Sequence, residues 1–78
     1  MKNKREALLE ALDYLDKGDW QSAHTIVQSD ESKAACWAHG IVHVMEGDLD
    51  NARYWYGRAQ RVFSENTASE MAELRATL

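Results

Sequence analysis

The sequence predicts an all-α domain built from two helical hairpins and a final helix. Apolar residues recur at helical spacing along the chain, and the dipeptide Gly-Asp occurs twice, each time between two such apolar stretches. The 78 residues contain no proline although 45% of them are hydrophobic, which favours helices over a β-sandwich or a disordered tail. A chain of this length forms one domain, close to the size at which a single core becomes marginal. We therefore expect a single helical domain over residues 1–78.

The first predicted hairpin spans residues 4–28. Its first helix, over 4–17, ends where Gly18 can adopt the left-handed conformation, and Asp19 then caps a second helix over 19–28. Apolar residues in the first helix follow the i, i+3, i+4, i+7 spacing of one buried face. The residues expected to face the core are Leu8, Ala11, Leu12, Leu15, Trp20, Ala23, Ile26 and Val27.

The second predicted hairpin spans residues 32–63 and has the same plan. A helix over 32–46 ends at Gly47, and Asp48 caps a further helix that continues to about residue 63. Its inward residues are expected to be Trp37, Ile41, Val44, Leu49, Ala52, Trp55, Tyr56, Ala59 and Phe63.

A final helix is predicted over residues 67–78. Thr67 and Glu70 have the spacing of a capping box, which favours a helix start at this point. This capping helix is expected to shield the open end of a helical stack, as the terminal elements of helical arrays do. Its inward face is Met71, Leu74 and Leu78, and its residues expected mostly outside are Glu70, Glu73 and Arg75.

The two hairpins are related by an internal repeat. Gly18 and Gly47 are 29 residues apart, and the same offset pairs Ala23 with Ala52. A shared helix breaker and a shared small residue indicate helix-hairpin repeats. The same offset pairs Leu8 with Trp37, Leu12 with Ile41, Leu15 with Val44 and Val27 with Tyr56.

The second hairpin resembles a tetratricopeptide-type repeat. Gly47-Asp48 is followed by Ala52, and then at helical spacing by Tyr56 and Ala59. The repeat is shorter than the usual ~34 residues and lacks a terminal proline, so the chain is TPR-like and not a standard array. This resemblance, which covers about residues 4–63, implies a stack in which the first helix of each hairpin lines a concave, ligand-holding side.

A longer pattern resembles a group of small bacterial proteins to which no activity is assigned. The similarity implies that the three histidines and the run Tyr54-Trp55-Tyr56 belong to one shared feature. In that group a glycine commonly follows the Arg-Ala pair, where Gln60 stands here. The matching residues are Ala23-His24-x-Ile26-Val27-Gln28, Trp37-Ala38-His39, His43, Glu46-Gly47-Asp48, Asn51-Ala52 and Tyr54-Trp55-Tyr56-x-Arg58-Ala59.

Chemistry-bearing side chains share one stripe of the predicted helix over residues 32–46. At 100° per residue this stripe lies opposite the apolar face of the same helix. His39 and His43 are one turn apart, a spacing with which two imidazoles can bind one metal ion. Glu46 or Cys36 could add a ligand, and His24 another from the first hairpin. A metal site would therefore consist of His24, His39, His43 and Glu46 and would take a divalent transition metal; the favoured interpretation of the sequence requires no cofactor.

Two other interpretations of these residues stay open. In the first, the histidines only pack between hairpins and hydrogen-bond to one another, to Tyr14 or to a backbone carbonyl, because buried polar groups need such partners. In the second, they line a binding groove together with aromatic and arginine side chains, which often anchor interfaces. The binding residues of that groove are His24, Trp37, His39, His43, Tyr54 and Arg58.

No motif identifies an enzyme. Gly40 follows His39 at the position where a zinc peptidase carries its glutamate base. A Cys36–His39 pair would need a third activating group and an oxyanion-stabilising loop, and the sequence has no Gly-rich loop. We name no catalytic residue and favour a non-enzymatic protein.

Charge and composition narrow the classes of partner that the protein is expected to bind. Nine basic and thirteen acidic residues give a net charge of −4, which argues against nucleic acid despite the local group of Arg53, Arg58 and Arg61. No apolar run approaches the ~20 residues that span a bilayer, so no membrane contact is expected. A single cysteine suits a reducing compartment, and the expected location is cytoplasmic.

These observations predict a helical-repeat interaction module that binds a protein segment or itself. Two hairpins bury little surface, and three or more repeats are normally needed for stability. A two-fold homodimer is the commonest way for a chain to supply the missing contacts. The alternative is a small metal- or ligand-binding protein that uses the histidine cluster.

Overall fold

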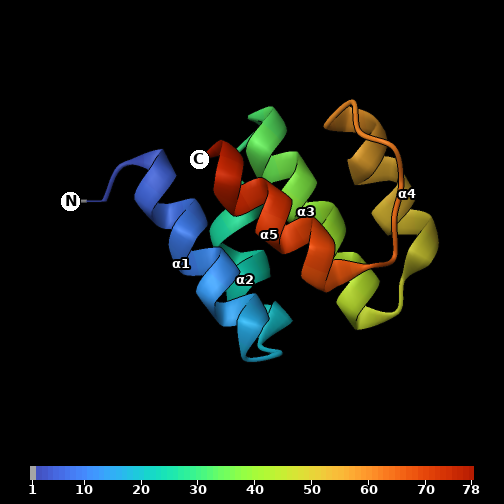
Figure 1. Cartoon of the computed structure of the whole chain (residues 1–78), viewed down its shortest axis with the longest axis horizontal. Helices are drawn as coiled ribbons and strands as arrows, with labels where there is room; N and C mark the ends of the chain where they lie inside the picture. Colours follow the sequence, from blue (N-terminus) through green and yellow to red (C-terminus); the bar gives the residue numbers. More distant parts are fainter. Residues whose placement is uncertain (1) are drawn as a thin grey trace.

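The structure, a computed structural model, describes residues 2–78 and contains five α-helices and no strand in that part of the chain (Figure 1). The all-α prediction is confirmed. No helix within the described residues is both long enough and apolar enough to cross a membrane. The helices are α1 (Lys4–Asp16), α2 (Trp20–Val27), α3 (Lys33–Glu46), α4 (Leu49–Arg58) and α5 (Thr67–Thr77).

The two hairpin turns have the same geometry. Gly18 and Gly47 are left-handed, with φ of 79° and 92°. The amides of Asp19 and Asp48 each donate to the carbonyl five residues earlier, at 2.9 Å in both turns. Each aspartate also caps the following helix by accepting a hydrogen bond from the amide three residues later. The repeated Gly-Asp therefore folds into the same helix stop and helix start twice.

Helix α3 is the centre of the molecule and packs against all four other helices. Every residue from Ala35 to His43 is buried, so this helix has no solvent face along most of its length. Helix α4 approaches it closely at Gly40, where an added Cβ would lie 2.5 Å from Cδ1 of Tyr56. The predicted inward face of α1 is also confirmed, with Leu8, Ala11, Leu12 and Leu15 all buried.

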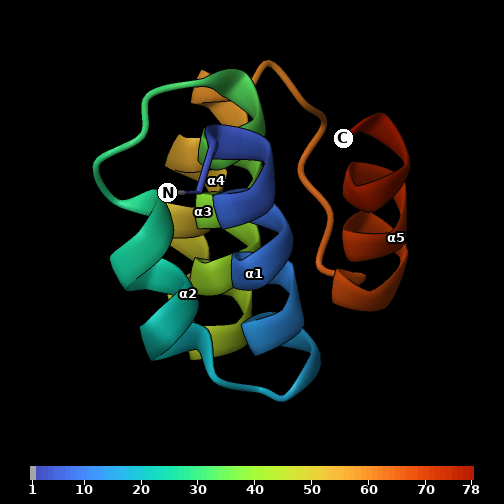
Figure 2. The ribbon, with the colours of Figure 1, turned by 90° about the vertical axis from the view of Figure 1, so that its left-hand side faces the viewer.

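Helix α5 packs on α3 and α1, and it meets α4 through the hydrogen bond from the Tyr56 hydroxyl to Glu70. Figure 2 shows α5 and α2 on opposite sides of the central helix. The sequence predicted that this helix would shield the open end of a helical stack. Instead it covers the side of the first helix of each hairpin, which is the side that a tetratricopeptide-type stack would use for ligands.

Helix α4 ends at Arg58, five residues before the predicted end near Phe63. Gln60 is left-handed, with φ of 58°, and the amide of Arg61 donates to the Tyr56 carbonyl at 3.0 Å. This is the Schellman arrangement, in which glycine is the usual left-handed residue. The prediction was wrong because glutamine gives no stop signal.

Candidate functional site

The three histidines of the chain come together between α2 and α3. His24 lies on α2, whereas His39 and His43 lie one turn apart on α3. The ring centroids are 4.7 Å apart for His24 and His39, 5.4 Å for His24 and His43, and 4.9 Å for His39 and His43. One donor atom from each ring can be chosen so that all three atoms lie within 4.8 Å of one another.

The packing of α2 against α3 explains why these rings meet. His39 and His43 are four residues apart and therefore project from the same side of α3. Helix α2 covers that side and brings its own His24 to it. His39 and His43 are buried, whereas His24 is half-buried, so the cluster reaches solvent at His24.

The plane of the His39 ring is set by Trp55 on α4. The two rings are stacked, with centroids 3.8 Å apart and an interplanar angle of 10°. The Tyr54 ring meets Trp55 edge-on at 5.1 Å, and the Arg58 guanidinium lies 5.2 Å from the Trp55 centroid. Tyr54 is 56% exposed, and it forms the outer rim of the cluster with Arg58.

Glu46 supports His43 and is not part of the three-histidine group. Its Oε1 lies 2.8 Å from Nδ1 of His43, within hydrogen-bonding distance. When Nδ1–H donates to this carboxylate, Nε2 of His43 is left as the free lone-pair nitrogen. A second group of donor atoms within 4.8 Å consists of His43, Glu46 and Asp48, of which the two acids are exposed.

Burial decides the protonation state of His39. Loss of solvation lowers the pKa of His39 to about 4, and repulsion from His43 and then His24 acts in the same direction. The ring is therefore neutral near pH 7, which is the form that binds metals.

Cys36 stays outside the cluster. Its thiol donates to the Glu31 carbonyl at 3.7 Å, and burial raises the pKa of Cys36. A buried thiol with a raised pKa is neither a ready nucleophile nor a ready metal ligand. The structure gives no support to Cys36 as a ligand.

The predicted binding residues fall on two sides of α3. His24, His39, His43, Tyr54 and Arg58 surround the cluster described above. Trp37 lies on the other side and its Nε1–H donates to Glu70 of α5 at 3.1 Å. Tyr56 also turns to Glu70, so the run from Tyr54 to Tyr56 is divided between the two sides.

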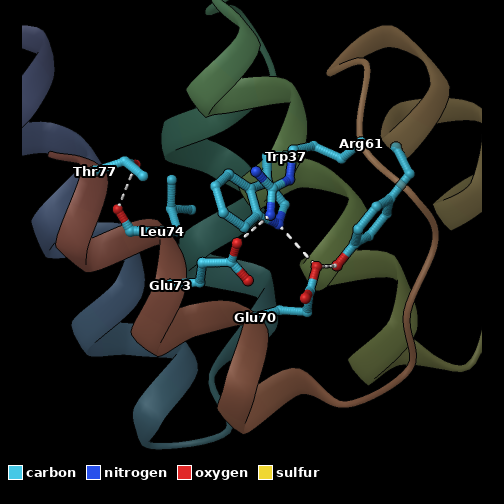
Figure 3. A network of polar contacts seen from close by, with 7 residues as sticks. Trp37, Arg61, Glu70, Glu73, Leu74 and Thr77 are labelled. Atoms are coloured by element: carbon cyan, nitrogen blue, oxygen red, sulfur yellow. Dashed lines mark hydrogen bonds and ion pairs between the residues drawn. The ribbon is translucent and has the colours of Figure 1, made fainter.

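Glu70 is the residue that sequence reasoning placed wrongly. It was expected mostly outside, but it is only 7% exposed. Its Oε1 accepts from Nε1–H of Trp37 and from the Tyr56 hydroxyl, the latter at 2.9 Å (Figure 3). Glu70 lies four residues before Leu74 and hence on the same face of α5, a signal that could have identified it.

Two arginines complete the attachment of α5. The Arg61 guanidinium lies 3.6 Å from the Trp37 ring centroid and pairs with Glu73 at 2.7 Å. Arg75 binds two carboxylates of α1, those of Asp13 at 2.9 Å and Asp16 at 2.6 Å. Helix α5 of the same chain therefore covers the side of the molecule formed by α1 and α3.

Comparison of the chain with protein-family models, with curated proteins and with solved structures found no match in any of the three. The geometry of this chain is therefore the guide to its function. Its two distinctive features are the histidine cluster on one side of α3 and the buried Glu70 network on the other.

Proposed function

We propose that the protein is a non-enzymatic interaction module that binds a second copy of itself through the outer face of its first hairpin. In the second hairpin, the corresponding outer face carries His39, His43 and Trp55 and is covered by α2. In the first hairpin, no helix within residues 2–78 covers the equivalent face. The first hairpin thus lacks a covering helix of the kind that α2 provides for the second hairpin.

The observation that carries the proposal is a hollow of about 260 Å³ at this equivalent position. Each residue that lines it has its counterpart 29 residues later, on or beside the histidine face. Glu10 corresponds to His39, Tyr14 to His43 and Ile26 to Trp55. The remaining lining residues are Ser22 and Thr25, which correspond to Asn51 and Tyr54. We call this hollow the seat of the first hairpin.

A second copy is the partner that best fits the seat. Two hairpins bury little apolar surface, and stacks of this type gain stability from each added neighbour. A two-fold contact places the same surface on both copies, so one seat can pack against the other. The seat includes residues of α2. Within the chain, α2 itself packs on the equivalent face of the second hairpin, which shows that a helix of its size and polarity suits such a face.

The groove expected from the tetratricopeptide resemblance receives less support. Helix α5 lies on the side that α1 and α3 share, with Glu70, Met71 and Leu74 all buried there. A peptide could bind this side only by displacing α5. Self-association through the first hairpin requires no such displacement.

Sedimentation equilibrium of the tag-free full chain tests the proposal. We expect a dimer at micromolar concentration, and we expect Thr25→Lys to raise the dimer Kd at least tenfold because it places a charge in the seat. Thr25 is exposed, so the monomer fold should survive this change. The matched control is Val62→Lys, at a residue that is 90% exposed between α4 and α5. A monomer throughout the concentration range, or an equal effect of both variants, would refute the proposal.

A further inference from the structure

The histidine cluster has a property that self-association does not use, namely three converging imidazole donors. The chain contains three histidines, and all of them are in this cluster. We propose that His24, His39 and His43 together bind one divalent transition-metal ion of the zinc class, with Glu46 as the positioning residue of His43.

The spacing of the rings fits a shared ion. Zinc–imidazole bonds of about 2.1 Å in a tetrahedral site place the ligand nitrogens about 3.4 Å apart. The donor atoms here lie within 4.8 Å of one another before any ion is bound, and the largest centroid separation is 5.4 Å. Small rotations of the rings would close the remaining distance without moving a helix.

Two of the three ligands are already oriented. The stack on Trp55 fixes the plane of His39, and the carboxylate of Glu46 holds Nδ1 of His43 at 2.8 Å. A carboxylate on the far nitrogen of a ligating histidine fixes its tautomer and increases its basicity, an arrangement common around zinc. His24 is the adjustable ligand, because it is half-buried and comes from a separate helix.

The donor set selects the class of metal. Three imidazoles without a carboxylate or thiolate among them suit Zn²⁺, Co²⁺, Ni²⁺ or Cu²⁺ and are poor ligands for Mg²⁺ or Ca²⁺, which prefer oxygen. Three protein ligands also leave one tetrahedral position free. Solvent reaches the cluster at His24, so water would take this fourth position.

The second group of donor atoms, that of His43, Glu46 and Asp48, could also hold an ion. Substitutions can distinguish an ion bound there from an ion bound by the three histidines. An ion held by His43, Glu46 and Asp48 would need the Asp48 carboxylate but would not need His24. Asp48→Asn removes that carboxylate and keeps a good helix cap, since asparagine and aspartate cap helices about equally well. His24→Gln removes a ligand of the proposed site from a half-buried position.

The experiment is calorimetric titration of the tag-free full chain with Zn²⁺, with Mg²⁺ as the control ion. We expect one Zn²⁺ per chain, no Mg²⁺ binding, and loss of about 100-fold or more in Zn²⁺ affinity in His24→Gln. Glu46→Gln should lose about 10- to 100-fold, as is typical when the support of a ligand is removed. Asp48→Asn should bind as the parent chain does. Circular dichroism of each variant confirms that the helices are retained.

A second measurement does not depend on any variant. In ¹⁵N spectra of the parent chain, one ring nitrogen of each of the three histidines should shift together as Zn²⁺ is added. Absence of Zn²⁺ binding, ring signals that do not move, or a loss in Asp48→Asn equal to that in His24→Gln would each overturn the proposal. The result is independent of self-association, which sedimentation measures separately.

Discussion

Gly40 shows how a single residue sets the distance between two helices. A Cβ at this position would lie 2.5 Å and 2.8 Å from ring carbons of Tyr56 and 3.4 Å from the Ala52 carbonyl oxygen. The Tyr56 ring is buried and held by its hydrogen bond to Glu70, so it has little room to move. Glycine therefore permits the close contact of α3 with α4 that brings Trp55 onto His39.

We expect Gly40→Ala to lower the free energy of unfolding by up to about 2 kcal/mol. Overpacking costs typically 1–3 kcal/mol, and the better helix propensity of alanine returns about 1 kcal/mol. Gly57→Ala is the matched control, because this helical glycine meets nothing within 4 Å and is exposed. That change should stabilise the protein by about 0.5–1 kcal/mol. Urea unfolding measures both values, and a stabilised Gly40→Ala variant would contradict the close approach.

His39 should make the stability of the metal-free protein depend on pH. Its folded pKa is about 4 and its ordinary value is 6.5, so between these values the unfolded chain binds a proton that the folded chain does not. The contribution of His39 to the free energy of unfolding is fully present above pH 6.5 and is lost as the pH falls towards 4. At about 1.4 kcal/mol per unit of pKa, the total is roughly 3 kcal/mol.

The measurement is a series of urea unfolding curves with chelator present, for the parent chain and for His39→Phe. Phenylalanine keeps a flat ring on Trp55 and removes the proton-binding site, so its stability should fall less between pH 6.5 and 4. Carboxylates titrate in both proteins, and their effect cancels in the difference. Two parallel profiles would show that burial does not disfavour the charged ring.

At the scale of elements, the attachment of helix α5 to the rest of the molecule depends on one carboxylate, that of Glu70. Glu70 accepts two hydrogen bonds, from Trp37 on α3 and from Tyr56 on α4, and thereby joins three helices. The Tyr56 pKa is raised by burial and by the neighbouring Glu70, so the hydroxyl stays protonated and remains a donor. Removing the acceptor would leave two buried donors without a partner, which costs more than the net value of the bonds.

We expect Glu70→Ala to lower the free energy of unfolding by about 3 kcal/mol, because each unsatisfied buried group costs about 1–3 kcal/mol. Glu70→Gln keeps a carbonyl acceptor and should cost about 1 kcal/mol. Glu73→Ala removes only a partly exposed ion pair with Arg61 and should cost less than about 1 kcal/mol. Denaturant unfolding followed by tryptophan fluorescence gives the order. Equal losses of unfolding free energy in Glu70→Ala and Glu73→Ala would show that the buried Glu70 acceptor does not matter for stability.

Element boundaries were predictable where a residue has one strong local preference. Gly18 and Gly47 adopt positive φ and end their helices as expected, because only glycine enters this region without a steric cost. The end of α4 was missed because Gln60 takes the same conformation under tertiary constraint, while the segment after it leads to α5. Local preference carries no information about such a constraint.

At the scale of the whole molecule, periodicity foresaw which side chains share a stripe but not which helix would cover it. The meeting of His39 and His43 follows from helical geometry, and the sequence suggested His24 as a further member of the group. The sequence could not show that Trp37 faces α5 whereas the histidines face α2. That division depends on where α5 docks, and its burial of Glu70 has no equivalent in the repeated hairpins.

The position of the proposed ion between two hairpins leads to a prediction about the whole fold. His24 belongs to the first hairpin, and His39 and His43 belong to the second, so a bound ion would join them. A ligand that binds only the folded state adds about 2.7 kcal/mol when its concentration is 100 times its Kd. For a domain of this size the melting temperature should then rise by roughly 10–20 °C. Chelator should reverse the rise.

The melting curves should be recorded with and without Zn²⁺ for the parent chain, His24→Gln and Thr25→Lys. His24→Gln should lose the Zn²⁺-dependent rise because one hairpin no longer contributes a ligand. Thr25→Lys should keep the rise, since Thr25 lines the seat and is not one of the three converging ligands. A rise that persists in His24→Gln would place the ion within the second hairpin, and the two hairpins would then be held together by packing alone.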